Sequence, residues 1–295
     1  MVSAEVRIGD CTLKNPVILA SGPSGYGLEY SDFINMEKLG AVVTKTISLN
    51  PRAGNSGRRL LETPSGLLNS VGLENVGAEV FFREKLPRLL ELGARPIVSL
   101  ACEGGGEYKG LLEAVSGNES IDIVELNLSC PNVDAGGMAV GTDPGMLEWY
   151  VKTARDILPE KAVLAKLTPN VGDISALAKV CEEAGADGIT AINTLLGMDI
   201  DPETGAPVFE RGVAGLSGPA IFPVALRAVY EICREVKIPV LGSGGINSVT
   251  GARKFFAAGA AAVQIGTAIF YDTGLPERIV DFTAGTESWK SRGGY

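Results

Sequence analysis

The chain of 295 residues contains no histidine. This absence excludes a Ser-His-Asp triad, a Cys-His pair, a histidine general base and a histidine-ligated metal. Any proton transfer must therefore use cysteine, lysine, aspartate, glutamate or tyrosine side chains, or water.

Cysteine is scarce and dispersed, with single residues at positions 11, 102, 130, 181 and 233. Because no two of them form a Cys-x-x-Cys pair, the sequence predicts neither an iron-sulfur cluster nor a zinc site in this chain. Cys181 and Cys233 each fall on the apolar stripe of a helical pattern, and we interpret both as core residues. An odd count in a reducing compartment makes disulfides unexpected.

Basic runs and long apolar runs are also missing. A formal net charge of -9 without a basic cluster argues against nucleic acid and anionic membranes as partners. No stretch approaches about 18 apolar residues, and residues 1–10 lack the regions of a signal peptide. The sequence predicts a soluble cytoplasmic protein, and a hydrophobic content of 45% is enough for a large core.

Apolar runs alternate with helical patterns along the whole chain. Eight runs predict buried strands, at residues 15–20, 42–46, 96–101, 121–128, 162–167, 187–192, 238–241 and 261–265. Helices are predicted near residues 31–39, 78–92, 174–184 and 219–236, and we expect left-handed glycine C-caps at Gly40, Gly93, Gly185 and Gly259. The pattern predicts one α/β domain, a (β/α)8 TIM barrel; a doubly wound open sheet is the alternative.

Two segments, residues 47–75 and 195–218, are predicted as inserted loops of the active-site face, because connections of this length are uncommon without a function. A third segment, residues 133–145, is rich in glycine, and we interpret it as a mobile flap.

Polar residues gather where the fourth predicted strand ends. Asn127, Ser129, Cys130 and Asn132 lie at or just beyond its C-terminal end, where barrels place their chemistry, and Pro131 stops the strand. An arbitrary cysteine is more often an inert core residue. The flanking asparagines favour a functional Cys130, which could act as a general base if its surroundings favour the thiolate.

Other strand ends complete a candidate ligand site. Lys45 and Lys166 end the second and fifth strands, while Gly244–Gly245 and Gly266–Thr267 follow the seventh and eighth, where barrels commonly bind phosphate. These groups describe a site for a phosphorylated cofactor with a polar ring, and FMN fits. A lysine near the pyrimidine edge of its ring would stabilise the negative charge that follows hydride uptake.

Several of these motifs resemble the dihydroorotate dehydrogenase family, and the resemblance covers essentially the whole chain. They are Asn-Leu-Ser-Cys-Pro-Asn at 127–132, Asn-Ser-Val-Gly-Leu at 69–73, Gly-Leu-Ser-Gly-Pro at 215–219, Gly-Gly-Ile at 244–246 and Gly-Thr at 266–267. Residues 125–132, 197–201 and 215–219 are most similar to the catalytic subunit of the class 1B, NAD-linked enzymes. Cysteine at the base position also resembles class 1, and no membrane-anchoring extension of class 2 is visible.

The resemblance implies roles for individual residues. Cys130 would take the C5 proton of dihydroorotate while the C6 hydride passes to the flavin, giving orotate in pyrimidine biosynthesis. FMN would be contacted by Ser21, Lys45, Thr46, Ser99, Asn127, Lys166, Ile192, Gly218, Gly244, Gly245, Gly266 and Thr267. The substrate would meet Lys45, Asn69, Ser70, Val71, Gly72, Leu73, Asn127, Asn193 and Thr194. Ser99 departs from the asparagine that relatives often carry at its position.

In the class 1B pattern, electrons leave through a second subunit that carries FAD and a 2Fe-2S cluster and reduces NAD. The resemblance therefore implies a homodimer core within a heterotetramer. A class 1A homodimer that uses fumarate is an alternative, as is another flavin barrel acting on a reduced pyrimidine, similar to dihydropyrimidine dehydrogenase. A barrel lyase or isomerase without flavin and a barrel that only binds a ligand are more distant alternatives.

Overall fold

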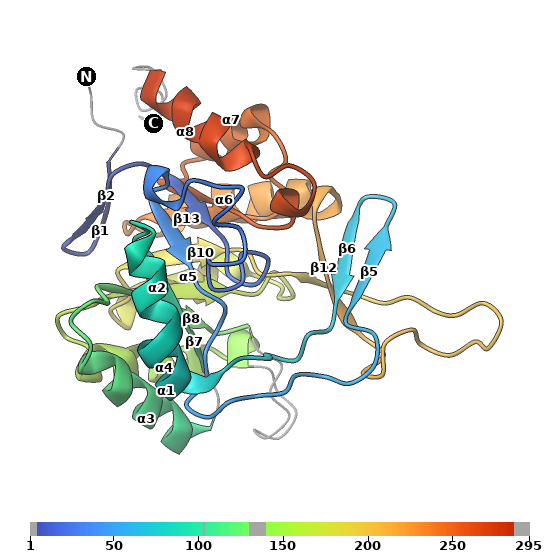
Figure 1. Ribbon diagram of the computed structural model, residues 1–295, viewed down its shortest axis with the longest axis horizontal. Helices are drawn as coiled ribbons and strands as arrows, with labels where there is room; N and C mark the ends of the chain where they lie inside the picture. Colours follow the sequence, from blue (N-terminus) through green and yellow to red (C-terminus); the bar gives the residue numbers. More distant parts are fainter. Residues whose placement is uncertain (1–4, 103, 130–139, 286–295) are drawn as a thin grey trace.

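Parallel strands form the centre of the molecule (Figure 1). The computed structural model describes residues 5–102, 104–129 and 140–285. In these residues eight strands close into a barrel in the order β10-β13-β14-β3-β4-β7-β8-β9. Their bounds are β3 Val17–Leu19, β4 Ala41–Val43, β7 Pro96–Ala101, β8 Ile123–Asn127, β9 Ala162–Leu167, β10 Gly188–Ala191, β13 Val240–Ser243 and β14 Ala262–Ile265. The predicted (β/α)8 barrel is confirmed, and the open sheet is excluded.

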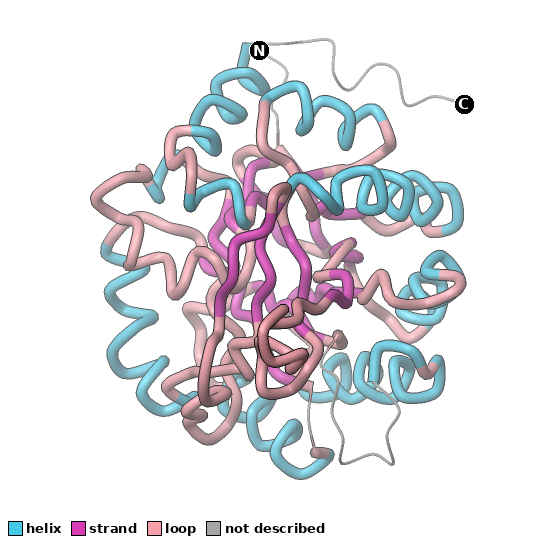
Figure 2. The backbone as a smooth tube through the Cα atoms, turned by 90° about the vertical axis from the view of Figure 1, so that its right-hand side faces the viewer, coloured by secondary structure: helices cyan, strands magenta, loops and turns pink. Residues whose placement is uncertain are grey.

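Helices surround the strands on the outside, as Figure 2 shows in cyan around magenta. They are α1 Gly77–Val80, α2 Leu86–Glu91, α3 Gly105–Ser116, α4 Pro144–Ile157, α5 Ile174–Glu183, α6 Phe222–Glu235, α7 Val249–Ala257 and α8 Leu275–Gly285. A π-helical segment, Phe81–Lys85, joins α1 to α2. At the start of α5, the Asp173 carboxylate accepts hydrogen bonds from the backbone N–H groups of Ser175 and Ala176 and caps the helix.

The helix predicted near residues 31–39 is wrong. Only a 3-10 turn forms there, Met36–Lys38. Asn35 has an extended conformation, and its side chain accepts a hydrogen bond from the Lys38 backbone N–H. The side chain therefore starts a short turn and interrupts any helix that would arrive from residue 31.

Three of the four predicted glycine caps have the left-handed conformation: Gly93 at φ +69°, Gly185 at +99° and Gly259 at +108°. The left-handed cap predicted at Gly40 is wrong, because this residue does not have a positive φ. A Cβ atom at Gly40 would lie 2.1 Å from the backbone oxygen of Asn15. Close approach of two chain segments, rather than left-handed geometry, requires glycine there.

The two long insertions pair with each other. Among their described residues, β11 Leu195–Gly197, β12 Ala214–Ser217, β6 Gly66–Asn69 and β5 Leu60–Thr63 form an antiparallel sheet in that order. β6 and β12 lie side by side away from the barrel strands in Figure 1. Segments predicted only as loops therefore form one sheet at a single face of the barrel.

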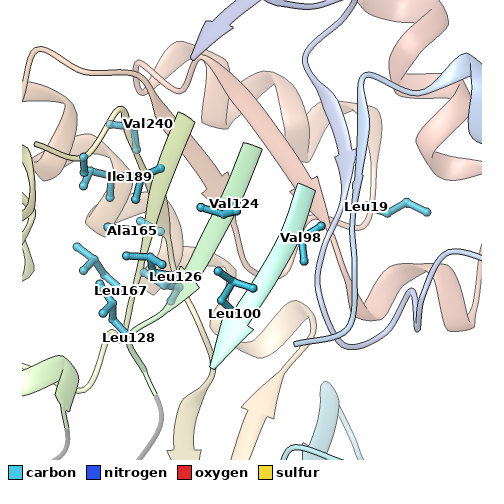
Figure 3. Packing of buried hydrophobic residues seen from close by; sticks show 14 of the residues in the cluster. Leu19, Val98, Leu100, Val124, Leu126, Leu128, Ala165, Leu167, Ile189 and Val240 are labelled. Atoms are coloured by element: carbon cyan, nitrogen blue, oxygen red, sulfur yellow. The ribbon is translucent and has the colours of Figure 1, made fainter. Parts of the chain in front are cut away.

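The apolar side chains of the strands form two separate clusters. Outward-facing residues such as Val98, Leu100, Val124 and Leu126 pack in the cluster between strands and helices (Figure 3). The alternate residues form a second cluster inside the barrel, with members Ile18, Ala41, Val43, Ile97, Ile123, Ala162, Leu164, Leu241 and Ala262. Val6, Ile8 and Leu13 of the hairpin β1 Val6–Ile8 and β2 Cys11–Leu13 belong to this inner cluster and cover it.

The cysteines of the described residues are free thiols. Cys181 is buried in the outer cluster and Cys233 packs against it, as predicted for core residues. Burial raises the pKa of Cys181 to about 12 and that of Cys233 to about 11, so both thiols stay protonated at neutral pH. Within the part of the chain that the structure describes, no helix combines the length and the apolar character needed to cross a membrane.

Candidate active site

One large cavity opens at the C-terminal ends of the barrel strands. Its volume is about 1350 Å³, above the ~300–1,000 Å³ typical of a pocket for one small ligand. Each barrel strand contributes to its lining within two residues of its C-terminal end: Ala20, Lys45, Ser99, Asn127, Lys166, Ile192, Ser243 and Gly266. The paired insertions supply much of the remaining lining. The cavity therefore occupies the face where this fold carries its chemistry.

All the site residues predicted from the sequence line this cavity where the structure describes them. They are Ser21, Lys45, Thr46, Asn69, Ser70, Val71, Gly72, Leu73, Ser99, Asn127, Lys166, Ile192, Asn193, Thr194, Gly218, Gly244, Gly245, Gly266 and Thr267. Cys130, Pro131, Asn132 and most of the predicted flap at residues 133–145 lie outside the described residues. The cavity brings together residues as far apart in the chain as Ser21 and Thr267, which are 246 positions apart. The candidate base, Cys130, is not among the residues that can be placed.

A hydrogen-bonded row of side chains crosses the floor of the cavity. Thr46 Oγ1 lies 2.8 Å from Ser99 Oγ and 3.4 Å from Ser21 Oγ. Asn127 donates from Nδ2 to Thr46 Oγ1 at 3.2 Å, and Asn193 donates from Nδ2 to Asn127 Oδ1 at 3.5 Å. These hydrogen bonds between strand ends fix the amide groups that face the cavity, and Ser99 belongs to this row.

Charged side chains stand beside the segment predicted to meet the substrate. Glu74 Oε2 lies 3.1 Å from Arg59 Nη1 and 3.4 Å from Lys45 Nζ. The hydrogen bond from Arg59, together with the charge of Lys45, lowers the pKa of the Glu74 carboxyl below its usual value. Leu73 has a left-handed φ of +54°, a conformation that non-glycine residues seldom adopt and that is found often at ligand sites.

Another part of the cavity wall, after β13 and β14, is built from backbone. Gly244 and Gly245 have φ values of +129° and +70°, and a Cβ atom at Gly245 would lie 2.7 Å from the backbone nitrogen of Phe222. Gly266 precedes the 3-10 turn Thr267–Phe270, whose first N–H groups have no partner inside the turn. Bare backbone of this kind suits a phosphate, which accepts hydrogen bonds from N–H groups at the start of a helical turn.

The most deeply buried charges lie just below the cavity. Lys166 Nζ is 3.2 Å from Glu125 Oε1, and their side chains are 7% and 0% exposed. The other carboxylate oxygen, Glu125 Oε2, accepts hydrogen bonds from Thr190 Oγ1 at 2.9 Å and Gln264 Nε2 at 2.6 Å. Lys166 was predicted as a site residue, whereas Glu125, Thr190 and Gln264 were missed. A carboxylate inside an otherwise apolar strand was the available signal.

Two further cationic residues of the lining were also missed, Arg52 and Arg211. Both lie in the insertions, whose sequences carry no periodic pattern that would place a side chain. Among the described residues, no group of histidine, cysteine, aspartate or glutamate is arranged to hold a metal ion.

Known proteins resemble this chain over nearly its whole length. The family model described as dihydroorotate dehydrogenase matches residues 3–282. The chain belongs to the dihydroorotate dehydrogenase family. It is therefore an oxidoreductase, which removes the lyase, isomerase and ligand-only alternatives.

Two relatives carry the same printed name, "Dihydroorotate dehydrogenase B (NAD(+)), catalytic subunit". The protein of Trichlorobacter lovleyi is 46% identical over 289 residues, which cover 98% of this chain and 94% of the relative. The protein of Thermoanaerobacter pseudethanolicus is 45% identical over 280 residues, covering 95% and 92%. The recognition of a type B catalytic subunit from sequence motifs is thereby confirmed.

A solved structure shares the fold. The dihydroorotate dehydrogenase of Eimeria tenella, crystallised in complex with ferulenol, superposes with a TM-score of 0.79 at 21% sequence identity. The match covers 99% of this chain and 88% of that structure, and it supports the barrel architecture of this dehydrogenase family member.

Proposed function

We propose that the chain oxidises dihydroorotate to orotate in pyrimidine biosynthesis, with FMN bound in the cavity. The observation that carries the proposal is that two chemically different sets of groups line one cavity. One set is the side chains of Lys45, Asn69, Asn127 and Asn193, and the other is the bare backbone of residues 244–245 and 266–267. The volume leaves room for both a cofactor and a substrate.

The residues present fit FMN. The glycine backbone and Thr267 would hold the phosphate, while Thr46, Ser99 and Asn127 would meet the polar part of the cofactor. When bound, FMN supplies the acceptor for the substrate hydride. Lys166 presents its ammonium group at the cavity floor, where it stabilises negative charge on the cofactor ring. Ile192, Ser21 and Gly218 would complete the contacts.

We assign substrate binding to the polar side chains of the lining. Dihydroorotate carries a carboxylate and ring amides, and Lys45 offers a cation to the carboxylate. The side-chain amides of Asn69, Asn127 and Asn193 can donate to and accept from the ring groups, and the segment from Ser70 to Leu73 adds backbone donors. Thr194 also lines the cavity. Cys130 would remove the C5 proton, a role that follows from the family resemblance.

The electron acceptor we propose is NAD, reached through a partner subunit that carries FAD and an iron-sulfur cluster in a heterotetramer. The printed names of the relatives, which include both NAD(+) and "catalytic subunit", support this assignment. This chain has no Cys-x-x-Cys spacing of its own for a cluster. A homodimer that passes its electrons to fumarate is the second candidate. The cytoplasmic location stays a prediction from the sequence.

An anaerobic titration of the purified chain with dihydroorotate tests the function. Bleaching of the visible flavin band with formation of orotate is the expected result. A yellow protein that stays yellow would retain FMN and overturn the substrate, and dihydrouracil would then be tried. A colourless protein that binds no added FMN would overturn the cofactor. NADH formation on adding the partner subunit, compared with turnover on fumarate, decides the acceptor.

A further inference from the structure

Glu125 has no part in the function proposed so far, yet it is the most completely buried charge of the barrel interior. Its side chain points inward from β8, one alternate position below Asn127, and it is 0% exposed. Its carboxylate receives hydrogen bonds from side chains on β9, β10 and β14. A carboxylate bonded from three separate strands has little freedom to move.

The same contacts determine where the Lys166 ammonium group lies. A lysine charge that is 93% removed from solvent costs several kcal/mol unless an opposite charge compensates it, and Glu125 Oε1 is the anion at 3.2 Å. Thr190 and Gln264 hold the carboxylate from the other side, through Oε2. The ammonium group is therefore kept between a fixed anion below and the cavity above.

The carboxylate also reduces the positive potential at the cavity floor. A lysine alone would attract the negative charge of a reduced flavin ring with its full charge, and the adjacent anion offsets part of that attraction. We propose that Glu125 is a positioning residue: it fixes the Lys166 ammonium group at the cavity floor and keeps the reduction potential of bound FMN lower than an unpaired lysine would. The proposal rests on the proposed function only in taking FMN as the occupant.

Glu125→Gln removes the charge while keeping the shape. Gln264 Oε1 is buried without a hydrogen-bond partner, so rotation of the Gln264 amide would let it accept from the new side-chain NH₂ group. The new carbonyl oxygen can still accept from Lys166. The substitution therefore changes the electrostatics of the cluster more than its hydrogen bonding.

The test is the midpoint potential of bound FMN, measured by anaerobic reduction with dithionite against a reference dye. Glu125→Gln should favour the reduced form by about tenfold relative to the wild type, a positive shift of about 30 mV for a two-electron couple. Glu125→Asp keeps the charge but draws the ammonium group away from the cavity, so we expect a shift of opposite sign. Thr190→Val, which removes a donor without changing charge, is the matched control and should shift the potential least.

An unchanged potential in a folded, yellow Glu125→Gln protein would overturn the proposal, as would shifts of the same sign in both Glu125 variants. If the Gln variant yields no soluble protein, the Asp variant decides alone, and an unchanged potential overturns the proposal. Dithionite reduction does not involve dihydroorotate. If the wild type failed to oxidise dihydroorotate but the two Glu125 variants showed the expected potential shifts relative to it, the proposed substrate would be contradicted and the role of Glu125 supported.

Discussion

The lower and upper halves of the barrel interior differ sharply in chemistry although the same strands build both. Below, the inward side chains are apolar, and on four of the strands they become polar two residues further along. The change occurs from Ile97 to Ser99 on β7, Ile123 to Glu125 on β8, Leu164 to Lys166 on β9 and Ala262 to Gln264 on β14. Ser99 lies opposite Glu125 in the β7–β8 register, whereas Glu125 lies opposite Leu164 on β9, so the change comes two residues later in the register of β9.

The outward faces of the same strands show no such change. Val124 and Leu126 on β8 are both buried among the helices, as are Val163 and Ala165 on β9. Apolar packing therefore continues on the outside along the full strand, while inside it stops beneath the cavity. The apolar lower interior therefore stabilises the barrel, whereas the upper interior has polar side chains that can face a ligand.

The strongest way to break this comparison is to place a charge in the lower half. Leu241→Asp would bury a carboxylate that has no cation among its apolar neighbours, and we expect a loss of at least about 5 kcal/mol in the free energy of unfolding. Soluble yield and thermal melting measure it. Leu241→Met, which nearly conserves volume, should cost less than about 1.5 kcal/mol. A Leu241→Asp protein with a melting temperature close to that of the wild type would contradict the stabilising role of the apolar lower half.

A substitution just beyond the strand ends should have the opposite effect: it should slow the reaction without changing the stability of the protein. Cys130→Ser should slow flavin reduction by dihydroorotate by about 10²- to 10⁴-fold, the usual contribution of a positioned base, or roughly 3–5.5 kcal/mol in the barrier. Stopped-flow absorbance under anaerobic conditions measures the rate, and the melting temperature serves as the control. Near-normal reduction at neutral pH would remove Cys130 from the role of base.

The sequence carried enough information for the barrel and for most of the cavity lining. Continuous apolar strands ending in Lys45, Asn127 or Lys166 already indicate which end of each strand is polar, and a Gly-Gly pair after the seventh strand marks bare backbone. Each of these signals lies within about ten residues of chain.

The parts that sequence could not predict depend on contacts between distant residues or on local competition. Glu125 and Lys166 are 41 positions apart, and their pairing appears only when the barrel closes. The sheet formed by the insertions joins Leu67 to Ser217 across 150 positions. The helix expected near residues 31–39 failed because the Asn35 side chain competes for a backbone N–H group, an effect that periodicity does not register.

A third prediction concerns the ion pair at the boundary between the two halves. Lys166→Met should cost about 3–5 kcal/mol of stability because it leaves the Glu125 carboxylate buried without its cation. It should also lower the rate of flavin reduction more than the affinity for dihydroorotate. Combining it with Glu125→Gln removes both charges, and we expect much of the lost stability to return. Chemical denaturation of the single and double variants measures the coupling, and strictly additive losses would contradict it.

The smallest expected effects come from two opposite substitutions, hydroxyl to methyl in the upper half and methyl to hydroxyl in the lower half. Thr190→Val removes a hydrogen bond to the Glu125 carboxylate in the upper half, and Val43→Thr adds a hydroxyl among the apolar side chains of the lower half. Each should cost about 1–3 kcal/mol in the free energy of unfolding, since one leaves a charged acceptor short of a donor and the other buries an unpaired polar group. Thr190→Ser, which keeps the hydroxyl, is the matched control and should cost less than Thr190→Val. A different outcome would be that Val43→Thr lowers the free energy of unfolding while Thr190→Val leaves it unchanged. The hydrogen bond from Thr190 would then not stabilise the protein, and the hydrogen bonds around Glu125 would not explain where its carboxylate lies.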